Sequence, residues 1–515
     1  MLVCITTSGT GSRLNEYTNF TNKSLVKLGD KLAICYIIEK YPEDTRFIIT
    51  LGHFGKFVKD FLELAYPEIF FTFVWIDQYE GEGSSLGYSL LCAKDLLQEP
   101  FIFHCCDTII DTKVIFQEYN TVYVSKSNKY NTYSSINVLN DNVIKFNKKG
   151  EQNNDYIYLG IFFMKNYKEF WKNLEELYLL DKNNSSLSDV HSIIKMVDNK
   201  IEFKYKYIDK FYDTGTVESY KEAQNHFKGN YDILDKYNES LCFMKDKVIK
   251  FFHDKKVNKQ RVLRAADLYP NVPKILDSRD NFMVMEHIDG ILLSESQTFD
   301  ILDLLKWSEK NLWLNKTINP LFVNTSYNFY YTKTIDRIKT IPFLNDEITI
   351  VNGMNTGKIY DLLNKVNFDN LCSDTFYKFH GDFILDNILK TNNGFILLDW
   401  RHEFGNELCL GDIYYDLAKL KHNSIFNHKN IKQNLFTITK NNLNVFVDLK
   451  CNYNLIKQLD DYNLFIKSRE FDMNKINIFT AIIWLNMAPL YEGTLREFLF
   501  YFGKLNLYLA IQERL

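Results

Sequence analysis

The sequence predicts an α/β protein with two domains: a parallel sheet covered by helices, then a small strand-rich lobe joined to a mainly helical lobe. Three observations predict this class. The chain has 515 residues, which is too long for a single hydrophobic core. Its first half alternates apolar runs with segments of helical periodicity. Its second half, after a short strand-rich stretch, has a mostly helical pattern as far as Leu515.

The order of elements in the first half supports the sheet. Apolar and β-branched runs predict four strands, and the periodic segments between them predict two helices: strands at Leu2–Thr6, Arg46–Leu51, Phe71–Ile76 and Phe101–Cys105, helices at Phe57–Ala65 and Leu86–Leu97. Strands that alternate with helices favour a parallel sheet with helices on both faces.

A polar, irregular segment at Phe227–Glu239 predicts the domain boundary, so that the two domains span residues 1–228 and 238–515. Beyond it the sequence predicts a hairpin, a basic helix at Lys255–Leu268 and a strand at Phe282–His287, before the helical region begins. This order is that of a small N-lobe followed by a helical C-lobe.

Composition narrows the class of function. Hydrophobic residues make up 46% of the chain and charged residues 24%, which is ordinary for a folded soluble protein. A net charge of −4 gives no basic surface for nucleic acid, and no stretch approaches the ~20 apolar residues of a membrane span. The nine cysteines form no CxxC pair, which favours free thiols in a reducing compartment. We therefore expect a cytoplasmic enzyme without a nucleic-acid partner, its oligomeric state left open.

The first predicted strand runs directly into a glycine-rich segment, TSGTGSR at Thr7–Arg13. Glycines let the backbone approach a phosphate chain, so that its N–H groups can surround the anion. We expect a nucleoside triphosphate to be bound by Ser8, Gly9, Thr10, Gly11 and Ser12, with Arg13 and Lys23 as the catalytic cations on its phosphates. The alternative interpretation is an ordinary turn after a strand.

Two aspartates follow apolar runs and are candidate metal ligands. Asp107 comes just after the predicted strand Phe101–Cys105, at the strand end where parallel α/β sheets place their ligands, and Asp213 follows another apolar and aromatic run. Two separated carboxylates can hold a Mg²⁺ that bridges a triphosphate and an incoming phosphate. Either aspartate alone is more often a helix cap or a turn residue.

These motifs, in this order, resemble those of the sugar-1-phosphate and phosphocholine nucleotidyltransferases over the first ~225 residues. The family's G-x-G-[TS]-R-L loop corresponds to Gly9–Leu14, with Ser8 in place of the motif's first glycine and Asn22 in place of the proline before Lys23. Its D-[IV]-G-[TN] signature is close to Asp213–Thr216. Its acceptor-side N-x-G-I-Y-x-F segment resembles Tyr158–Phe162, without the asparagine.

The resemblance implies a Rossmann-like, GT-A-like domain and a role for each residue. A stretch that contacts the base is matched loosely at Gly83–Gly87, which adds Gly83, Ser84 and Ser85 to the nucleotide-binding residues. The implied reaction is in-line attack of a phosphomonoester oxygen on the α-phosphate of a nucleoside triphosphate, with pyrophosphate leaving. Asp107 and Asp213 would hold Mg²⁺, and no general base is needed, because the attacking phosphate is already ionised near pH 7.

The most specific string of the chain lies in the second half: HGDFILDN at His380–Asn387, followed by FILLDW at Phe395–Trp400. Phosphoryl transfer to a hydroxyl needs a carboxylate near the acceptor and metal ligands that hold the ATP phosphates. An Asp followed five residues later by an Asn on one loop can supply both, and an Asp at the end of an apolar strand can complete the metal site. The alternative is a surface loop beside a strand-end aspartate.

This region resembles the aminoglycoside phosphotransferase and choline kinase family, whose H-G-D-x-x-x-x-N and later I-D-[WF] motifs it matches. Gly411–Ala418 matches the family's G-D-x-x-x-D-L-A segment, and the resemblance covers roughly residues 238–515. It implies an α+β, protein-kinase-like bilobal domain. Asp382 is then the catalytic base, and Asn387 and Asp399 hold Mg²⁺.

The N-lobe of this second domain is matched less fully. Lys250, in Val248–Phe251, resembles the lysine that pairs with the ATP phosphates, and Glu286, in Met283–His287, lies in a segment like the adenine-contacting hinge. No Gly-rich loop precedes Lys250, and Lys255–Leu268 contains no glutamate partner for it. The alternative for Lys250 is an ordinary lysine at a strand edge.

A kinase makes a phosphomonoester and a nucleotidyltransferase consumes one, so we expect a bifunctional enzyme whose two sites act in sequence on a small alcohol. Its substrates are ATP, a second nucleoside triphosphate (CTP is favoured) and choline, a polyol or a sugar. Its product is a nucleotide-activated precursor for surface glycan or capsule decoration. Choline would call for an aromatic and acidic pocket. The alternatives are a sugar kinase joined to a sugar-1-phosphate nucleotidyltransferase that uses GTP, UTP or dTTP, two uncoupled activities, and a kinase-like scaffold without activity.

Overall fold

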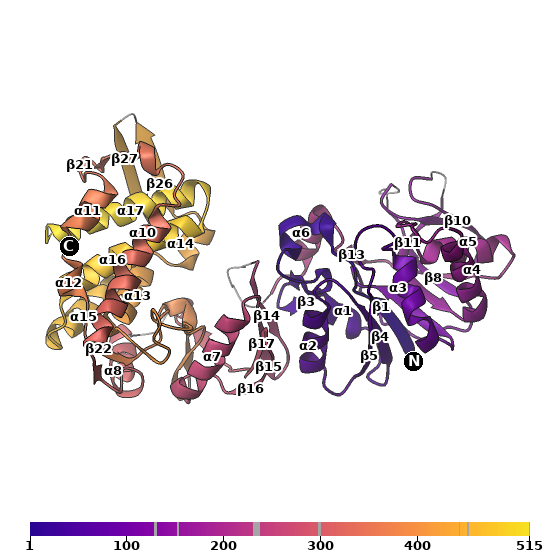
Figure 1. The fold of residues 1–515 in the computed structure, drawn as a ribbon, viewed down its shortest axis with the longest axis horizontal. Coiled ribbons are helices and arrows are strands. Elements are labelled where there is room, and N and C mark those ends of the chain that lie inside the picture. The colour runs from indigo at the N-terminus through magenta and orange to yellow at the C-terminus, as the bar shows by residue number, and fades with distance from the viewer. Residues whose placement is uncertain are drawn as a thin grey trace. The chain divides into compact units, whose positions relative to one another are not determined.

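A computed structural model describes residues 1–127, 131–151, 154–229, 237–296, 300–441, 443–450 and 453–513. The chain divides into two compact units (Figure 1). The first unit comprises Met1–Lys255 with Leu276–His287, and the second comprises Lys256–Ile275 with Ile288–Leu515. The predicted boundary at residues 229–237 falls mostly on 230–236, which lie outside the described residues.

The first unit is built on a nine-stranded sheet. In spatial order its strands are β5 (Phe70–Trp75), β4 (Arg46–Leu51), β1 (Leu2–Thr6), β6 (Phe101–Cys105), β11 (Tyr156–Met164), β8 (Thr121–Ser125), β12 (Lys204–Tyr207), β10 (Asn142–Asn147) and β9 (Ser135–Leu139). A two-stranded sheet joins β7 (Thr108–Ile110) to β13 (Phe211–Asp213), and another joins β2 (Lys27–Leu28) to β3 (Lys31–Leu32). The helices are α1 (Ala33–Ile38), α2 (Gly55–Ala65), α3 (Leu86–Ala93), α4 (Tyr167–Leu180), α5 (Asp189–Asp198) and α6 (Val217–His226).

The four strands predicted in this half are present. Three have the predicted bounds, and the strand predicted at Phe71–Ile76 is shifted by one residue to β5. The helix predicted at Phe57–Ala65 begins two residues earlier, as α2, and the one predicted at Leu86–Leu97 ends at Ala93, followed by a 3-10 turn at Lys94–Leu96. β1 is buried along its whole length, as expected of a central strand covered on both faces.

The expected all-parallel sheet is wrong in its second half. β5, β4, β1 and β6 are mutually parallel, but β11 runs antiparallel to both of its neighbours, β6 and β8. The chain passes from β8 to β11 through the antiparallel β9–β10 pair and not through a crossover helix. Without such a crossover, the returning strand can pair antiparallel.

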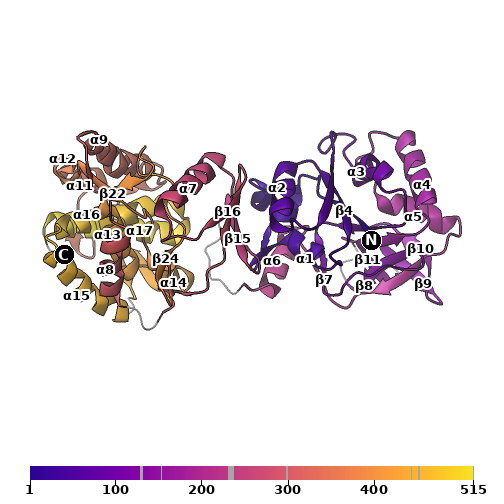
Figure 2. The same ribbon diagram turned by 90° about the horizontal axis from the view of Figure 1, so that it is seen from below.

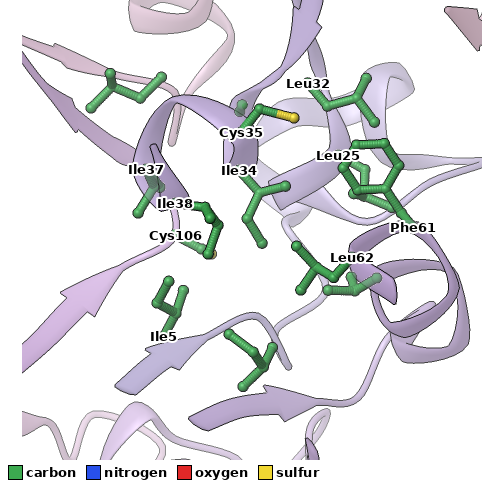
Figure 3. Packing of buried hydrophobic residues seen from close by; sticks show 14 of the residues in the cluster. Ile5, Leu25, Leu32, Ile34, Cys35, Ile37, Ile38, Phe61, Leu62 and Cys106 are labelled. Carbon is green, nitrogen blue, oxygen red and sulfur yellow. The ribbon is translucent and has the colours of Figure 1, made fainter. Parts of the chain in front are cut away.

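The two faces of β1 support two buried layers. Val3 and Ile5 belong to a hydrophobic cluster with α1 and α2, whereas Leu2 and Cys4 belong to a cluster with α3, α4 and α5. Figure 3 shows the first layer, where side chains of α1 and α2 gather above Ile5. Helices on both faces of the sheet are therefore confirmed.

A second sheet of the first unit contains the hairpin predicted after the boundary. Its order is β14 (Glu239–Phe243), β15 (Lys247–Phe252), β17 (Phe282–Glu286) and β16 (Ile275–Ser278). Phe251 and Phe282 of this sheet join the buried cluster of α1 and α2, with ring centroids 5.1 Å from Phe57 and 6.1 Å from Phe61. These strands, assigned by sequence to the second domain, thus share the core of the first unit.

The second unit is mainly helical, as predicted. Its helices are α7 (Lys255–Leu268, of which Lys255 belongs to the first unit), α8 (Ile301–Asn311), α9 (Leu321–Tyr327), α10 (Lys333–Ile338), α11 (Ile359–Lys365), α12 (Phe368–Leu371), α13 (Ile413–Ile425), α14 (His428–Lys432), α15 (Tyr453–Ser468), α16 (Met473–Met487) and α17 (Gly493–Ile511). Figure 2 shows α13, α16 and α17 in the C-terminal part, where α16 packs against both others.

Small sheets complete the second unit. They are formed by β18 (Ile291–Leu292), β23 (Ile388–Thr391) and β24 (Gly394–Leu397), by β19 (Thr317–Ile318), β22 (Thr375–Lys378) and β25 (Leu410–Gly411), and by β21 (Met354–Asn355), β20 (Ile350–Val351), β27 (Asn444–Leu449) and β26 (Phe436–Asn441). Among the described residues of the whole chain, no helix has the length and apolarity needed to cross a membrane.

Candidate functional sites

The glycine-rich segment after β1 is held at its start and open at its centre. Thr7 is fixed to β4, since its backbone N–H and its hydroxyl both donate to the Thr50 carbonyl, over 3.1 and 2.7 Å. The side chain of Ser8 is buried, with its Oγ 2.9 Å from Ser89 Oγ on α3. Ser8 therefore anchors the segment through its side chain and through its carbonyl, which accepts from the His53 N–H at 2.9 Å, and its backbone N–H is left for a ligand.

The backbone from Ser8 to Arg13 can receive an anion. Its N–H groups donate no hydrogen bond to any residue that the structure describes, and a Cβ built on Gly9 would meet nothing within 4 Å. Gly11 has a φ of +69°, and a Cβ there would lie 2.9 Å from Lys23 Cβ, so glycine also permits the close approach of Lys23. Ser12 and Arg13 are exposed, and Thr10 is half-buried.

Asn22 replaces the proline of the resembled motif and holds the lysine segment in place. Its Nδ2 donates to the carbonyls of Thr7 (2.8 Å) and His53 (2.6 Å), and its Oδ1 accepts from the Ser24 backbone at 2.9 Å. Lys23 then extends its ammonium to within 3.1 Å of Asp107 Oδ2. Lys23 thus lies beside Gly11 of the glycine-rich segment, and its role on the phosphates stays a prediction.

The two predicted metal ligands face a common space at Gly215. A Cβ built on Gly215 would lie 2.9 Å from Asp213 Oδ1, 3.2 Å from Asp107 Oδ2 and 3.4 Å from an Arg13 guanidinium nitrogen. β13 brings Asp213 there by pairing with β7, and the Thr214 N–H donates to the Asp107 carbonyl at 2.8 Å. The structure thus brings together residues that are widely separated in the sequence.

The two aspartates differ in protonation. Burial raises the pKa of Asp107, but Lys23 outweighs it and lowers this pKa to about 2. The pKa of Asp213 is raised by burial and by the neighbouring charge of Asp107, although Tyr133 Oη (2.6 Å) and the Gly215 N–H (2.6 Å) donate to its carboxylate. Oxygen ligands around an open space suit Mg²⁺, and a divalent cation would favour the ionised form of Asp213.

Tyr133 and Gly215 carry functions at this site that the sequence did not predict for them. Tyr133 lies in a polar stretch with no motif, so no signal marked it. Gly215 stood inside a recognised signature, and its small size becomes meaningful only once Asp107 is placed beside it.

The predicted base-contacting stretch lies at the start of α3. Ser85 caps this helix by accepting from the Tyr88 N–H at 3.0 Å, and Ser84 Oγ donates to the Gly81 carbonyl at 2.7 Å. Gly83 has a φ of +80°, which suits glycine. The side chains of both serines are thus engaged by their own loop, and contact of this stretch with a base stays a prediction.

In the second unit, Asp416 shapes the loop that contains Asp382. Its carboxylate accepts from the backbone N–H groups of His380 (2.8 Å) and Gly381 (2.7 Å) and from Trp313 Nε1 (3.1 Å). Asp412 caps α13 by accepting from the Tyr414 N–H at 3.0 Å. The two aspartates of the Gly411–Ala418 segment therefore have structural duties, one on the loop and one on the helix.

Asp382 and Asn387 lie together, as their spacing predicts. Asn387 Nδ2 donates to the Asp382 carbonyl (3.0 Å) and to Asp382 Oδ2 (3.2 Å), which leaves the amide Oδ1 as an acceptor for a cation. Lys419 of α13, which the sequence did not single out, places its Nζ 2.6 Å from Asp382 Oδ1. Burial raises the pKa of Asp382, but Lys419 outweighs it and lowers this pKa to about 2.

Asp399 completes the predicted cluster. It follows β24, and the preceding Leu398 N–H donates to the Asn387 carbonyl at 2.7 Å. Asp399 has a φ of +51°, an uncommon conformation for a residue with a side chain, and it forms an ion pair with Arg261 of α7. Its negative charge acts to raise the pKa of Asp382, so the two carboxylates are near enough to interact. Asn387 and Asp399 supply the oxygen ligands that Mg²⁺ prefers.

Lys250 and Glu286 belong to the first unit, whereas Asp382, Asn387 and Asp399 belong to the second. Lys250 is buried on β15, and its carboxylate partner is Glu239 of the adjacent strand β14, at 3.7 Å. Glu286 is half-buried at the end of β17, where its backbone lies opposite that of Lys247 on β15. Lys250 is thus no exposed strand-edge lysine, and the role of both residues in ATP binding stays a prediction.

No protein-family model and no curated protein matches this chain. Among solved structures, the chain is similar to the inositol-1-phosphate CTP transferase from T. maritima, with 16% identity, a TM-score of 0.37 and coverage of 44% of this chain and 95% of that chain. It is similar to CTP:phosphocholine cytidylyltransferase from Streptococcus pneumoniae, with 18% identity, a TM-score of 0.36 and coverage of 44% and 99%. It is also similar to a UDP-glucose pyrophosphorylase complexed with UDP-glucose, with 17% identity, a TM-score of 0.37 and coverage of 44% of this chain and 97% of that chain. These similarities concern the N-terminal part of the chain.

Proposed function

We propose that the first unit is a nucleotidyltransferase that couples a phosphomonoester to a nucleoside triphosphate. The observation that carries this proposal is the convergence of Asp107, Asp213 and Arg13 on the space at Gly215, with Lys23 on Asp107. Two carboxylates for a cation and two cations for phosphates are what nucleotidyl transfer requires. The backbone N–H groups from Ser8 to Arg13 add donors for the triphosphate.

In this reaction the protein's task is to position the substrates and neutralise charge. Asp107 and Asp213 would hold Mg²⁺, which supplies charge neutralisation on the α-phosphate and on the leaving pyrophosphate. Arg13 and Lys23 offset the charge of the phosphates. A phosphomonoester oxygen forms a new bond to the α-phosphorus while the bond to the pyrophosphate oxygen breaks, and no residue needs to remove a proton.

The test is pyrophosphate release from each nucleoside triphosphate in the presence of phosphomonoesters and Mg²⁺. Asp107→Asn and Asp213→Asn should each lower release more than ~100-fold. Asp198→Asn, a change at an exposed aspartate at the end of α5, serves as the matched control. Near-normal release by either site variant would remove that aspartate from the proposed machinery.

We also propose that the second unit transfers a phosphoryl group from ATP to a small alcohol. The observation that favours this is the cluster of Asp382, Asn387 and Asp399 on one loop and the adjoining strand end. Asp382 accepts the proton of the alcohol as its oxygen attacks the γ-phosphorus, and ADP leaves. Asn387 and Asp399 would hold Mg²⁺, which supplies charge neutralisation on the ATP phosphates.

Together the two activities would convert an alcohol into a phosphomonoester and then into a nucleotide-activated alcohol, a precursor for surface glycan or capsule decoration. CTP is the favoured second triphosphate. The alternative is a sugar kinase joined to a sugar-1-phosphate nucleotidyltransferase that uses GTP, UTP or dTTP, or two uncoupled activities. A one-pot reaction of the alcohol with ATP and each triphosphate, followed by mass analysis, distinguishes them. Product with CTP from the unphosphorylated alcohol is expected, and pyrophosphate release that never uses the kinase product would contradict coupling.

A further inference from the structure

Beside the catalytic loop of the second unit lies a group of four basic side chains. Lys333 and Arg337 come from α10, Arg401 follows Asp399 by two residues, and Lys419 comes from α13. We call these four residues the basic cluster. None of them was singled out by the sequence.

The members of the basic cluster are close enough to repel one another. Burial lowers the pKa of Lys333 well below its usual value, and the positive charges of Arg401, Arg337 and Lys419 lower it further. Two members contact the ring of Phe329, with Lys333 Nζ 3.7 Å from its centroid and the Arg401 guanidinium 5.0 Å from it.

The basic cluster borders the reacting groups. Lys419 Nζ lies 2.6 Å from Asp382 Oδ1, and the Arg401 N–H donates to the His380 carbonyl at 3.0 Å. Lys419 thus belongs to both the cluster and the contact with Asp382. A molecule seated on the cluster would lie on the side of Asp382 from which Lys419 approaches.

Little negative charge compensates these cations. Arg337 donates to the Asn486 carbonyl at 3.1 Å and Arg401 to the Glu403 carbonyl at 2.8 Å, both uncharged acceptors. Lys333 contacts the Phe329 ring, which carries no net charge. Within the described part of the chain, the carboxylate ion-paired with the cluster is that of Asp382, to Lys419.

Four half-buried cations with a single carboxylate between them are costly to maintain, so their arrangement calls for a further anion. We propose that the basic cluster binds a carboxylate or phosphate group carried by the alcohol that the second unit phosphorylates. This inference rests on the proposed kinase function and specifies its substrate class. It disfavours choline, because a quaternary ammonium would meet positive charges where it needs an acidic pocket.

The reaction on such a substrate balances without a further reactant. The hydroxyl oxygen bonds to the γ-phosphorus of ATP, the bond from that phosphorus to the β–γ bridging oxygen breaks, and ADP leaves. The hydroxyl proton goes to Asp382. Lys333 and Arg401 bind the anionic group of the same molecule, so they affect acceptor binding and not the bond that breaks.

The experiment compares alcohols that differ in charge. ADP formation is measured with glycerol against glycerate, glucose against glucuronate, and choline as the cationic alcohol. The anionic member of at least one pair should show a kcat/KM more than ~10-fold higher than its neutral partner, the ratio that one desolvated ion pair of about 1.4 kcal/mol supports. Equal turnover of neutral, cationic and anionic alcohols would overturn the inference and leave the kinase function standing.

Two variants locate the effect. Lys333→Met should raise the KM for the anionic acceptor ~10-fold or more and change the KM for ATP far less, and Lys333→Arg should restore the acceptor KM. Lys339→Met, at the exposed end of the same helix, is the matched control. A rise confined to the KM for ATP would assign the cluster to the nucleotide and overturn the inference.

Calorimetry separates this inference from the proposed function. Binding of glycerate or glucuronate to the wild-type chain, and its loss in Lys333→Met, supports the anion site even if no alcohol yields ADP. In that outcome the kinase assignment fails and the anion site stands. Absence of both binding and charge preference would refute the anion site.

Discussion

Each candidate site sets a lysine against an aspartate, but the surroundings of the two pairs differ. In the first unit Lys23 lies 3.1 Å from Asp107, and a second carboxylate, Asp213, accepts from Tyr133 and from the Gly215 N–H. In the second unit Lys419 lies 2.6 Å from Asp382, and the second carboxylate, Asp399, is already ion-paired with a basic residue of its own unit. At the first site the acids and cations converge on Gly215, whereas at the second site each of the two acids is ion-paired with a cation.

The two sites differ in which existing contacts a ligand would have to displace in order to bind. At the first site a cation would join Asp213 while Tyr133 continues to hold it. At the second site a metal ion would have to compete with Arg261 for Asp399, and the proposed alcohol would have to compete with Lys419 for Asp382. We therefore expect the first site to be sensitive to volume and the second to charge.

The sharpest test of this contrast is Gly215→Ala. The new Cβ would lie 2.9 Å from Asp213 Oδ1 and 3.2 Å from Asp107 Oδ2, so the carboxylates would have to shift. Pyrophosphate release should fall more than ~100-fold, while ADP formation by the second unit continues. Glu218→Gln, at an exposed residue three positions further on, is the control. Normal release would show that the space at Gly215 is not the site.

A large effect is also expected from Asp416→Asn. The amide cannot accept from all three of the donors that now reach Asp416, so a buried N–H loses its partner. The second unit should lose ~2–3 kcal/mol of stability and most of its ADP formation, measured by thermal denaturation and by kinase assay. Asp361→Asn, at an exposed residue of α11, should change neither. Full stability of the Asp416 variant would contradict its role in shaping the loop.

The charge dependence of the second site can be measured by pH. Lys419→Met removes the cation that holds the pKa of Asp382 at about 2 against the effect of burial. Burial then raises this pKa, so more of the carboxyl is protonated in mildly acidic solution. The acid limb of kcat for ADP formation, at saturating alcohol, should move to higher pH by at least about one unit. An unmoved limb would show that Lys419 does not control Asp382.

The smallest effect on activity is expected from a change at Asn22, which stands where the resembled motif has proline. Asn22 has a φ of −74°, which proline can adopt, so Asn22→Pro leaves the backbone intact and removes the bonds to the carbonyls of Thr7 and His53. The first unit should lose ~1–2 kcal/mol of stability, with pyrophosphate release changed less than ~3-fold. A large loss of release at unchanged stability would instead give Asn22 a part in the chemistry.

Features that depend on neighbouring residues in the sequence were predicted, and features that depend on the path of the chain were not. β1, β4 and β6 were predicted to the residue because central strands are uninterrupted apolar runs. The direction of β11 was not predicted, because it depends on the path of the chain before it. The spacing of Asp382 and Asn387 on one loop was sufficient to predict their contact.

The partners of these residues were missed because they depend on packing. Glu239 reaches Lys250 only because β14 and β15 pair with Leu241 opposite Lys250, which places Glu239 on the same face two residues away. Arg261 stood within a basic helix with nothing to mark it. The position of Lys419 depends on how α13 packs against the loop that contains Asp382.

The sheet of β14, β15, β17 and β16 changes where the chain can be divided into independent domains. Because Phe251 and Phe282 lie in the same core as Phe57 and Phe61, a chain ended near residue 228 would leave an apolar face of α2 bare to water. Lys250 lies on that same sheet. The predicted division of the chain near residue 228 therefore does not separate two independent cores, and the strands that carry Lys250 should unfold cooperatively with the rest of the first unit.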